Sequence, residues 1–253
     1  MRLFALNVLI TLALAAPAWS DAAEIRVATA SNFRDAMTVL ARKFEQESGH
    51  RAIPVYGSTG KHYAQIVNGA PFDAFFAADS RRPQQLEQDG LTVPGSRFTY
   101  ARGQLVLWSP RAGYIDEKGL VLRQGNFRHL AIANPELAPY GAAARDVLES
   151  LGLWQALSPQ LVQGENIGQA FLFVASGNAE LGFVAWSQLA TGKQPVKGSV
   201  WRVPENLYRP VDQQAVAITN TEATRAFMAF IKSEEATRII RAHGYATQTT
   251  GLP

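Results

Sequence analysis

The sequence contains no cysteine. Disulfide bonds, thiol catalysis, thiol redox chemistry and cysteine-ligated metal sites are therefore excluded. A chain without disulfides must be held together by its hydrophobic core, and 253 residues are enough to bury one. The length fits one large domain or two medium ones.

The sequence also lacks a large excess of either positive or negative charge. The net charge is only +3, and acidic and basic residues are interspersed without any basic block. This distribution argues against a nucleic-acid-binding protein, because such proteins carry a concentrated basic surface. The composition is ordinary for an α/β protein, without repeats or low-complexity segments.

Long hydrophobic runs are absent, and the longest apolar stretch lies at the N-terminus, in "MRLFALNVLITLALAAPAWSDAA". Arg2, the apolar residues 3–15 and the small residues around Ser20 form the pattern of a secretory signal peptide. The run is shorter than the roughly 20 residues that span a membrane. We expect residues 1–22 to be a signal peptide, cleaved after Ser20 or Ala22, and the mature protein to be soluble and periplasmic.

No catalytic set can be recognised. The four histidines are far apart and form no metal-binding pair: His50, His62, His129 and His243. No paired carboxylates can be assigned to acid–base chemistry, and Asp73 and Asp79 are interpreted as structural caps. Arg81 and Arg82 are interpreted as a solvated helix start. We therefore expect a protein that is not an enzyme.

Apolar strand patterns alternate with helical ones along the chain. Strands are expected at residues 24–30, 52–57 and 72–79, with amphipathic helices between them, which indicates a parallel sheet with crossover helices. Four candidate helix starts follow strands or loops: Ser31, Ser58, Tyr140 and Ile167. In open α/β sheets, ligands bind beyond the carboxyl ends of the strands.

The segment "VYGSTGKHYAQIVNG", residues 55–69, resembles a phosphate loop but lacks its spacing. Val55 stands five residues before Gly60, where a Walker loop needs glycine, and His62 follows Lys61. A nucleophile elbow would need glycine at Tyr56. The remaining interpretation is a helix start capped by Ser58, whose free N–H groups and dipole suit an anion.

Several motifs, in order from residue 24 onward, carry a family resemblance: "RVATASNFRDAM", "GSTGKHYAQIVNGAPFDAFFAAD", "ANPELAPYGAAARDVL", "LGLWQALSPQLVQGENIGQAF" and "AELGFVAW". They resemble the periplasmic molybdate-binding proteins (ModA) of bacterial ABC importers. The resemblance implies an α/β, two-lobed type II solute-binding fold, each lobe a mixed, mainly parallel sheet flanked by helices. One lobe would comprise residues 23–103 and 214–253, and the other residues 104–213.

The resemblance also implies a binding site for a tetrahedral oxyanion, held by hydroxyl and backbone N–H groups without direct salt bridges. The motifs place it at Ser31, Asn32, Ser58, Tyr140 and the backbone N–H of Ile167. Some family members donate a tyrosine hydroxyl from the position of Ala185, which leaves the donor set open here. Lys61 is left outside the site, as a solvated side chain or one that steers anions. No cofactor is implied, and molybdenum would enter only as its oxyanion.

The expected function is capture of molybdate, and also of tungstate, by a monomer that delivers it to the membrane permease of an ABC importer. Three alternatives remain open. The ligand could be another small anion, namely sulfate, thiosulfate or an organic carboxylate. The chain could be an exported hydrolase that uses Ser58. It could also be the effector half of a transcription regulator, which the signal sequence disfavours.

Overall fold

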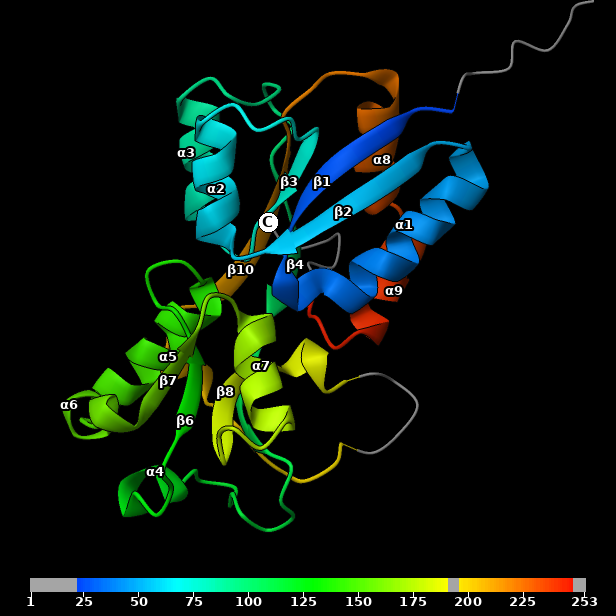
Figure 1. Ribbon diagram of the computed structural model, residues 1–253. Helices are drawn as coiled ribbons and strands as arrows, with labels where there is room; N and C mark the ends of the chain where they lie inside the picture. Colours follow the sequence, from blue (N-terminus) through cyan, green and yellow to red (C-terminus); the bar gives the residue numbers. More distant parts are fainter. Residues whose placement is uncertain (1–21, 191–195, 248–253) are drawn as a thin grey trace, which may run out of the picture.

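The computed structural model describes residues 22–190 and 196–247, which form two lobes (Figure 1). Each lobe is built on one five-stranded sheet flanked by helices. The fold class predicted from the sequence is therefore confirmed. The predicted signal peptide lies, up to residue 21, outside the described residues and stays a prediction. Among the described helices, none is long and apolar enough to cross a membrane.

The first lobe holds the strand order β2-β1-β3-β10-β4. Strand β1 is parallel to β2 and β3, whereas β10 is antiparallel to both β3 and β4. The strands are β1 (Glu24–Ala30), β2 (Arg51–Gly57), β3 (Ala74–Phe76), β4 (Phe98–Gly103) and β10 (Val211–Ala217).

Helices cover both faces of this sheet, which explains why β1 is apolar along most of its length. Ile25 and Val27 pack with the helices on one face, while Ala28 packs on the other. The first face carries α1 (Arg34–Ser48), α8 (Glu222–Ile231) and α9 (Glu234–Ala242), and the second carries α2 (Thr59–Val67) and α3 (Arg81–Gln88).

The second lobe repeats this arrangement with the order β7-β6-β8-β5-β9. Strands β7, β6 and β8 are parallel, and β5 runs antiparallel between β8 and β9. The strands are β5 (Leu105–Ser109), β6 (Leu130–Ala133), β7 (Leu161–Gly164), β8 (Leu181–Ala185) and β9 (Ser199–Arg202). The helices are α4 (Val121–Gln124), α5 (Pro139–Ser150), α6 (Trp154–Leu157) and α7 (Ile167–Ala175).

The chain passes between the lobes twice. The first passage is at Gln104, between β4 and β5, and the second leads from β9 to β10. Strand β10 begins at Val211, which pairs with Gly103 of β4. Residues 211–213, which the sequence-based division assigned to the second lobe, therefore belong to the first sheet, because the second passage ends before Val211.

The two sheets bring the carboxyl ends of their parallel strands to the gap between the lobes. β1 and β2 end in register at Ala30 and Gly57, and β6 and β7 end in register at Ala133 and Gly164. The segment that follows each of these strands leads toward the partner lobe. This is the place where open α/β sheets bind ligands.

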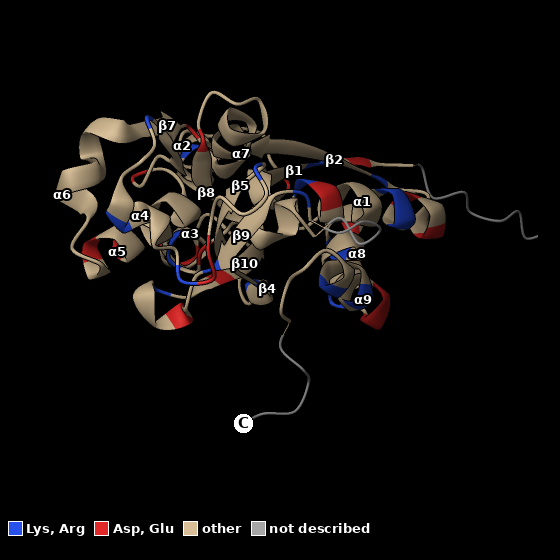
Figure 2. Cartoon of the chain, turned by 90° about the horizontal axis from the view of Figure 1, so that it is seen from below, with Lys and Arg blue, Asp and Glu red and all other residues tan. Residues whose placement is uncertain are grey.

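Charged side chains show no segregation by sign. In Figure 2, acidic and basic residues lie beside one another over the helices of both lobes. Many of them pair, for example Lys43 with Glu235 and Arg209 with Asp146. The described surface is therefore of mixed charge, as the sequence indicated.

Candidate functional site

A small cavity, about 10 Å³ in volume, lies between the lobes. The structure brings all five sequence-predicted site residues together around it, although they come from both lobes. No charged side chain lines it. The lining residues are Ala30, Ser31, Asn32, Gly57, Ser58, Thr59, Ala78, Ala138, Pro139, Tyr140, Asn166 and Ile167.

Ser58 is the residue most directly poised for a ligand. It is the N-cap of α2 and only 2% exposed, yet its Oγ has no hydrogen-bond partner among the described residues. The adjoining Thr59 is fixed, because its Oγ1 accepts a hydrogen bond from the backbone N–H of Ala78 at 3.0 Å. An unpaired buried hydroxyl is costly unless something binds it.

Ser31 links the two lobes at the cavity. Its Oγ accepts a hydrogen bond from the backbone N–H of Gly168, in α7 of the second lobe, at 3.3 Å. Because the oxygen is the acceptor in this contact, the hydroxyl proton of Ser31 remains available to an anion. Ser31 follows directly on β1, so the strand end places it at the gap.

Asn32 lines the cavity but its side chain is engaged elsewhere. Nδ2 donates to Oε1 of Gln213 at 2.8 Å and to the hydroxyl of Tyr245 at 3.0 Å. The carbonyl of Asn32 accepts from Tyr245 and from Ser187 of the second lobe. The backbone N–H of Asn32, and not its side-chain amide, is therefore the donor left for a ligand.

Tyr140 also lines the cavity, and its hydroxyl lies against Gln213 and Gly103. The side chain is 1% exposed, and the phenol oxygen accepts a hydrogen bond from Nε2 of Gln213 at 3.3 Å. It lies so close to Gly103 that a Cβ there would overlap it. Burial raises the pKa of Tyr140 well above its ordinary value, so the phenol stays neutral. Its backbone N–H, in the first turn of α5, is a further donor available to a ligand.

The start of α7 is held by two side chains that sequence reasoning did not single out. Oδ1 of Asn166 accepts from the N–H groups of Gly168 and Gln169 at 2.9 and 3.2 Å. Nε2 of Gln188 donates to the carbonyl of Ile167 at 3.2 Å. An Asn directly before a helix is an N-cap signal, so Asn166 could have been found from the sequence; Gln188 could not.

Three helices thus begin at the cavity: α2, α5 and α7. The first N–H groups of a helix have no acceptor within it, and the helix dipole makes this end positive. No described residue accepts a hydrogen bond from the backbone N–H of Thr59, Tyr140 or Ile167. Together with the hydroxyls of Ser31 and Ser58, these groups form a shell of neutral donors around the cavity.

The nearest charges are paired with each other at the rim. Lys61 of α2 lies 3.1 Å from Glu165, across the gap between the lobes. Arg82 of α3 pairs with Asp79 and is only 9% exposed. The interpretation of Arg82 as a solvated residue is therefore wrong, because the second lobe covers it.

Comparison with known proteins agrees with this architecture. Residues 25–246 match the family described as bacterial extracellular solute-binding protein. The molybdate-binding protein ModA of Azotobacter vinelandii is 50% identical over 90% of this chain and 92% of its own. ModA of Rhodobacter capsulatus is 44% identical over 98% of this chain and 97% of its own.

A solved structure supports the same relationship. The periplasmic molybdate-binding protein of Azotobacter vinelandii superposes with a TM-score of 0.86 at 43% identity, covering 89% of this chain and all of that one. The sulfate-binding protein SubI of Mycobacterium tuberculosis, at 15% identity and a TM-score of 0.69, shares the fold. The chain belongs to the bacterial extracellular solute-binding proteins and, among them, to the ModA family.

Proposed function

We propose that this protein is a periplasmic receptor that captures molybdate between its lobes and delivers it to the permease of an ABC importer. Tungstate, equal in charge and nearly equal in size, is expected to bind as well. The protein would act as a monomer, after removal of the N-terminal signal peptide. It would carry out no chemistry on its ligand.

One observation supports this proposal above all: the unpaired, buried hydroxyl of Ser58 meets three helix N-termini at a cavity that no charged side chain lines. Hydrogen bonds from neutral donors to a charged ligand contribute roughly 1.5–3 kcal/mol each. A tetrahedral dianion has four oxygens to receive them. The relatives named above as molybdate-binding proteins support the choice of anion.

A shell that offers N–H and hydroxyl donors but no charged acceptor also selects among anions. Hydrogen phosphate carries an O–H that needs an acceptor, and burying it unpaired is costly. Sulfate is smaller than molybdate, so donors spaced for molybdate would not all reach it. The related fold of a sulfate-binding protein keeps sulfate as the alternative ligand to be tested.

The alternative of a Ser58-dependent hydrolase gains no support from the geometry. A serine nucleophile needs a general base within hydrogen-bond reach. Among the described residues, no such base contacts Oγ of Ser58. The nearest histidine in sequence, His62, directs Nδ1 toward Gln65 at 3.1 Å instead.

The test is calorimetric titration of the mature protein with molybdate, tungstate, sulfate, thiosulfate, phosphate and citrate. We expect molybdate and tungstate to bind tightly and to raise the unfolding temperature. Ligand at 1,000 times its Kd stabilises a protein by roughly 4 kcal/mol, which a thermal scan detects easily. Binding of sulfate or thiosulfate but not of molybdate would refute the choice of ligand while keeping the class of protein.

A further inference from the structure

The loop before α5 is fastened to the first lobe by two hydrogen bonds. The backbone N–H of Gly60 donates to the carbonyl of Leu137 at 2.8 Å. Nη2 of Arg82 donates to the carbonyl of Glu136 at 2.9 Å. Both acceptors lie on the second lobe and both donors on the first, so these bonds exist only when the lobes are closed.

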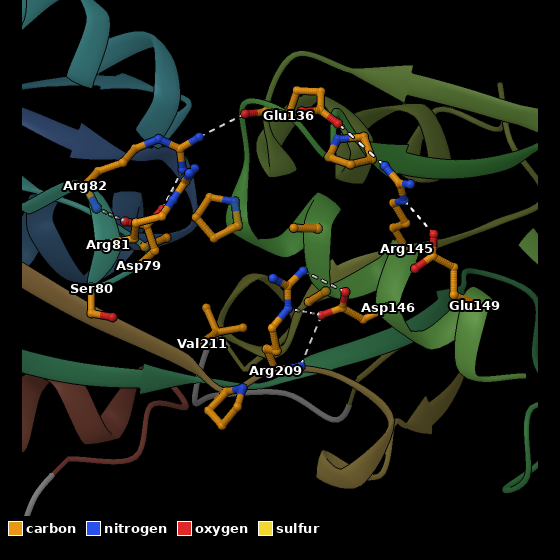
Figure 3. A pocket seen from close by; sticks show the side chains of 16 residues that line it. Asp79, Ser80, Arg81, Arg82, Glu136, Arg145, Asp146, Glu149, Arg209 and Val211 are labelled. Atoms are coloured by element: carbon orange, nitrogen blue, oxygen red, sulfur yellow. Dashed lines mark hydrogen bonds and ion pairs between the residues drawn. The ribbon is translucent and has the colours of Figure 1, made fainter. Parts of the chain in front are cut away.

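Arg82 is held in position by its own lobe. Its Nη1 pairs with Oδ2 of Asp79 at 2.5 Å, and its backbone N–H donates to Oδ1 of the same carboxylate at 3.0 Å. In Figure 3 the guanidinium lies between Asp79 and Glu136, at the edge of an open hollow of about 510 Å³ between α3 and α5. The planar guanidinium can serve both partners at once because its donors form a fixed fork.

The loop that Arg82 contacts is held by hydrogen bonds to Asn134 and leads to the cavity. Oδ1 of Asn134 accepts from the N–H of Glu136, and its carbonyl accepts from the N–H of Ala138, both at 2.9 Å. Pro139 and Tyr140 follow and begin α5 at the cavity. A contact that fixes Glu136 therefore also fixes the N–H of Tyr140 opposite Ser58.

The ion pair between the lobes, Lys61 with Glu165, is more exposed than the Arg82–Asp79 pair that orients the guanidinium within the first lobe. The two side chains are 51% and 35% exposed, against 11% and 18% for Arg82 and Asp79. Exposed pairs are screened by water and salt and contribute little, whereas charged hydrogen bonds out of water are stronger. Removing the buried Arg82 contact should therefore weaken the closed form more than removing the exposed Lys61–Glu165 pair.

We propose that Arg82, oriented by Asp79, is the latch of the closed form: a positioning residue that slows release of the bound anion without touching it. This inference rests on the proposed function, because release is defined for a bound ligand. The latch acts on the dissociation rate, since it forms only after the lobes have met around the anion.

The experiment uses the absence of natural cysteines. Two exposed residues, Gln46 on α1 and Gln155 on α6, are replaced by cysteine and labelled, so that their separation reports opening of the lobes. The dissociation rate of molybdate is measured in this background for Arg82→Lys, Asp79→Asn and Lys61→Met. Arg82→Lys keeps the charge beside Asp79 but cannot bridge to Glu136 as well.

We expect Arg82→Lys and Asp79→Asn each to raise the dissociation rate at least about tenfold, with little change in the association rate. Lys61→Met, the control, should change it by only about twofold. Both latch variants should also shift the distance distribution of the labels toward the open form. Rates and distributions equal to those of the parent would overturn the latch.

The two proposals fail in different ways. If the parent protein shows no response to molybdate, the proposed ligand is wrong, and the latch is then judged from the label distances alone. Identical distances in the parent and in Arg82→Lys would then refute it. If the parent binds molybdate and Arg82→Lys releases it at the same rate, the function stands and the latch does not.

Discussion

At the scale of single residues, Ser58 has the clearest consequence. Replacing it with alanine removes one donor to the anion, so molybdate affinity should fall by roughly 1.5–3 kcal/mol. The ligand-free protein should be no less stable, because its Oγ has no partner to lose. Calorimetry and urea unfolding measure the two quantities. Ser176→Ala, distant on the exposed end of α7, is the control, and equal affinity in both variants would contradict the role of Ser58.

His62, four residues further along α2, should make stability depend on pH. Burial lowers the pKa of His62 below its ordinary value of 6.5, because the side chain is only 2% exposed and Nε2 has no described partner. Below pH 6.5 the unfolded chain therefore takes up a proton before the folded protein does. The stabilisation is complete above that pH and is lost as the pH falls through the folded pKa.

The measurement is urea unfolding of the ligand-free protein between pH 7.5 and pH 5. His62→Gln should show a flatter dependence than the parent, since a neutral amide takes up no proton. The other titrating groups are shared by both proteins and cancel in the difference. Parallel curves would show that His62 protonates equally in the folded and unfolded states.

Several residue-scale properties could be predicted from the sequence, and others could not. The positions of Ser31 and Ser58 at helix starts could be predicted because a small hydroxyl residue after a strand and before a helix is a local signal, whereas their role as ligand contacts was implied by the family resemblance. The direction of the Tyr140 side chain could not be predicted, because it depends on a hydrogen bond with Gln213, which is distant in the sequence. The burial of Arg82 was missed for the same reason, since the covering loop comes from the other lobe.

At the scale of elements, the start of α2 must come very close to the second lobe. A Cβ on Gly60 would stand 2.9 Å from the carbonyl oxygen of Leu137, a backbone atom that cannot turn aside. Gly60→Ala should therefore hinder closure of the lobes by a steric clash and weaken molybdate binding at least about tenfold. The open form is free of this clash, and alanine favours a helix over glycine by roughly 1 kcal/mol.

Titration calorimetry checks this expectation, with Lys61→Ala at the next position of the same helix as the matched control. The control should change affinity little, because the Lys61–Glu165 pair is largely exposed. A Gly60→Ala protein that binds as tightly as the parent would show that the lobes need not meet so closely around the ligand.

The order of elements was easier to predict than their pairing. Alternating apolar strands and amphipathic helices indicated a parallel α/β sheet, because this pattern is local, whereas the division into two lobes was implied by the family resemblance. The position of β10 between β3 and β4 depends on pairing such as Val216 with Phe75, far apart in the chain. The predicted lobe boundary at residue 213 accordingly fell inside β10, although Pro210, directly before the strand, is a local signal that could have marked its start.

At the scale of the whole molecule, a buried polar network joins the two lobes at the passages between them. Gln213 of β10 is fully buried; its Oε1 accepts from Asn32 and Tyr100, and its Nε2 donates to Tyr140. Asn32 and Tyr100 belong to the first lobe and Tyr140 to the second. One amide thus ties the cavity-lining segments of both lobes to the strand that connects them.

Replacing Gln213 with alanine takes one of two acceptors from the side-chain amide of Asn32, whereas the hydroxyl of Tyr100 keeps the carbonyl of Ala77 at 3.1 Å. An unpaired buried donor costs roughly 1–3 kcal/mol, so the free energy of unfolding of the ligand-free protein should fall by about that much. Molybdate affinity should fall too, because Asn32 and Tyr140 lose the contact that fixes their backbones at the cavity.

Gln214→Ala is the control. Gln214 is the next residue of β10, and its side chain forms hydrogen bonds with Thr99 and Arg97, both in the first lobe. If both variants lose stability but only Gln213→Ala loses affinity, the network transmits hinge geometry to the site. Equal affinities in the two variants would mean that it serves stability alone.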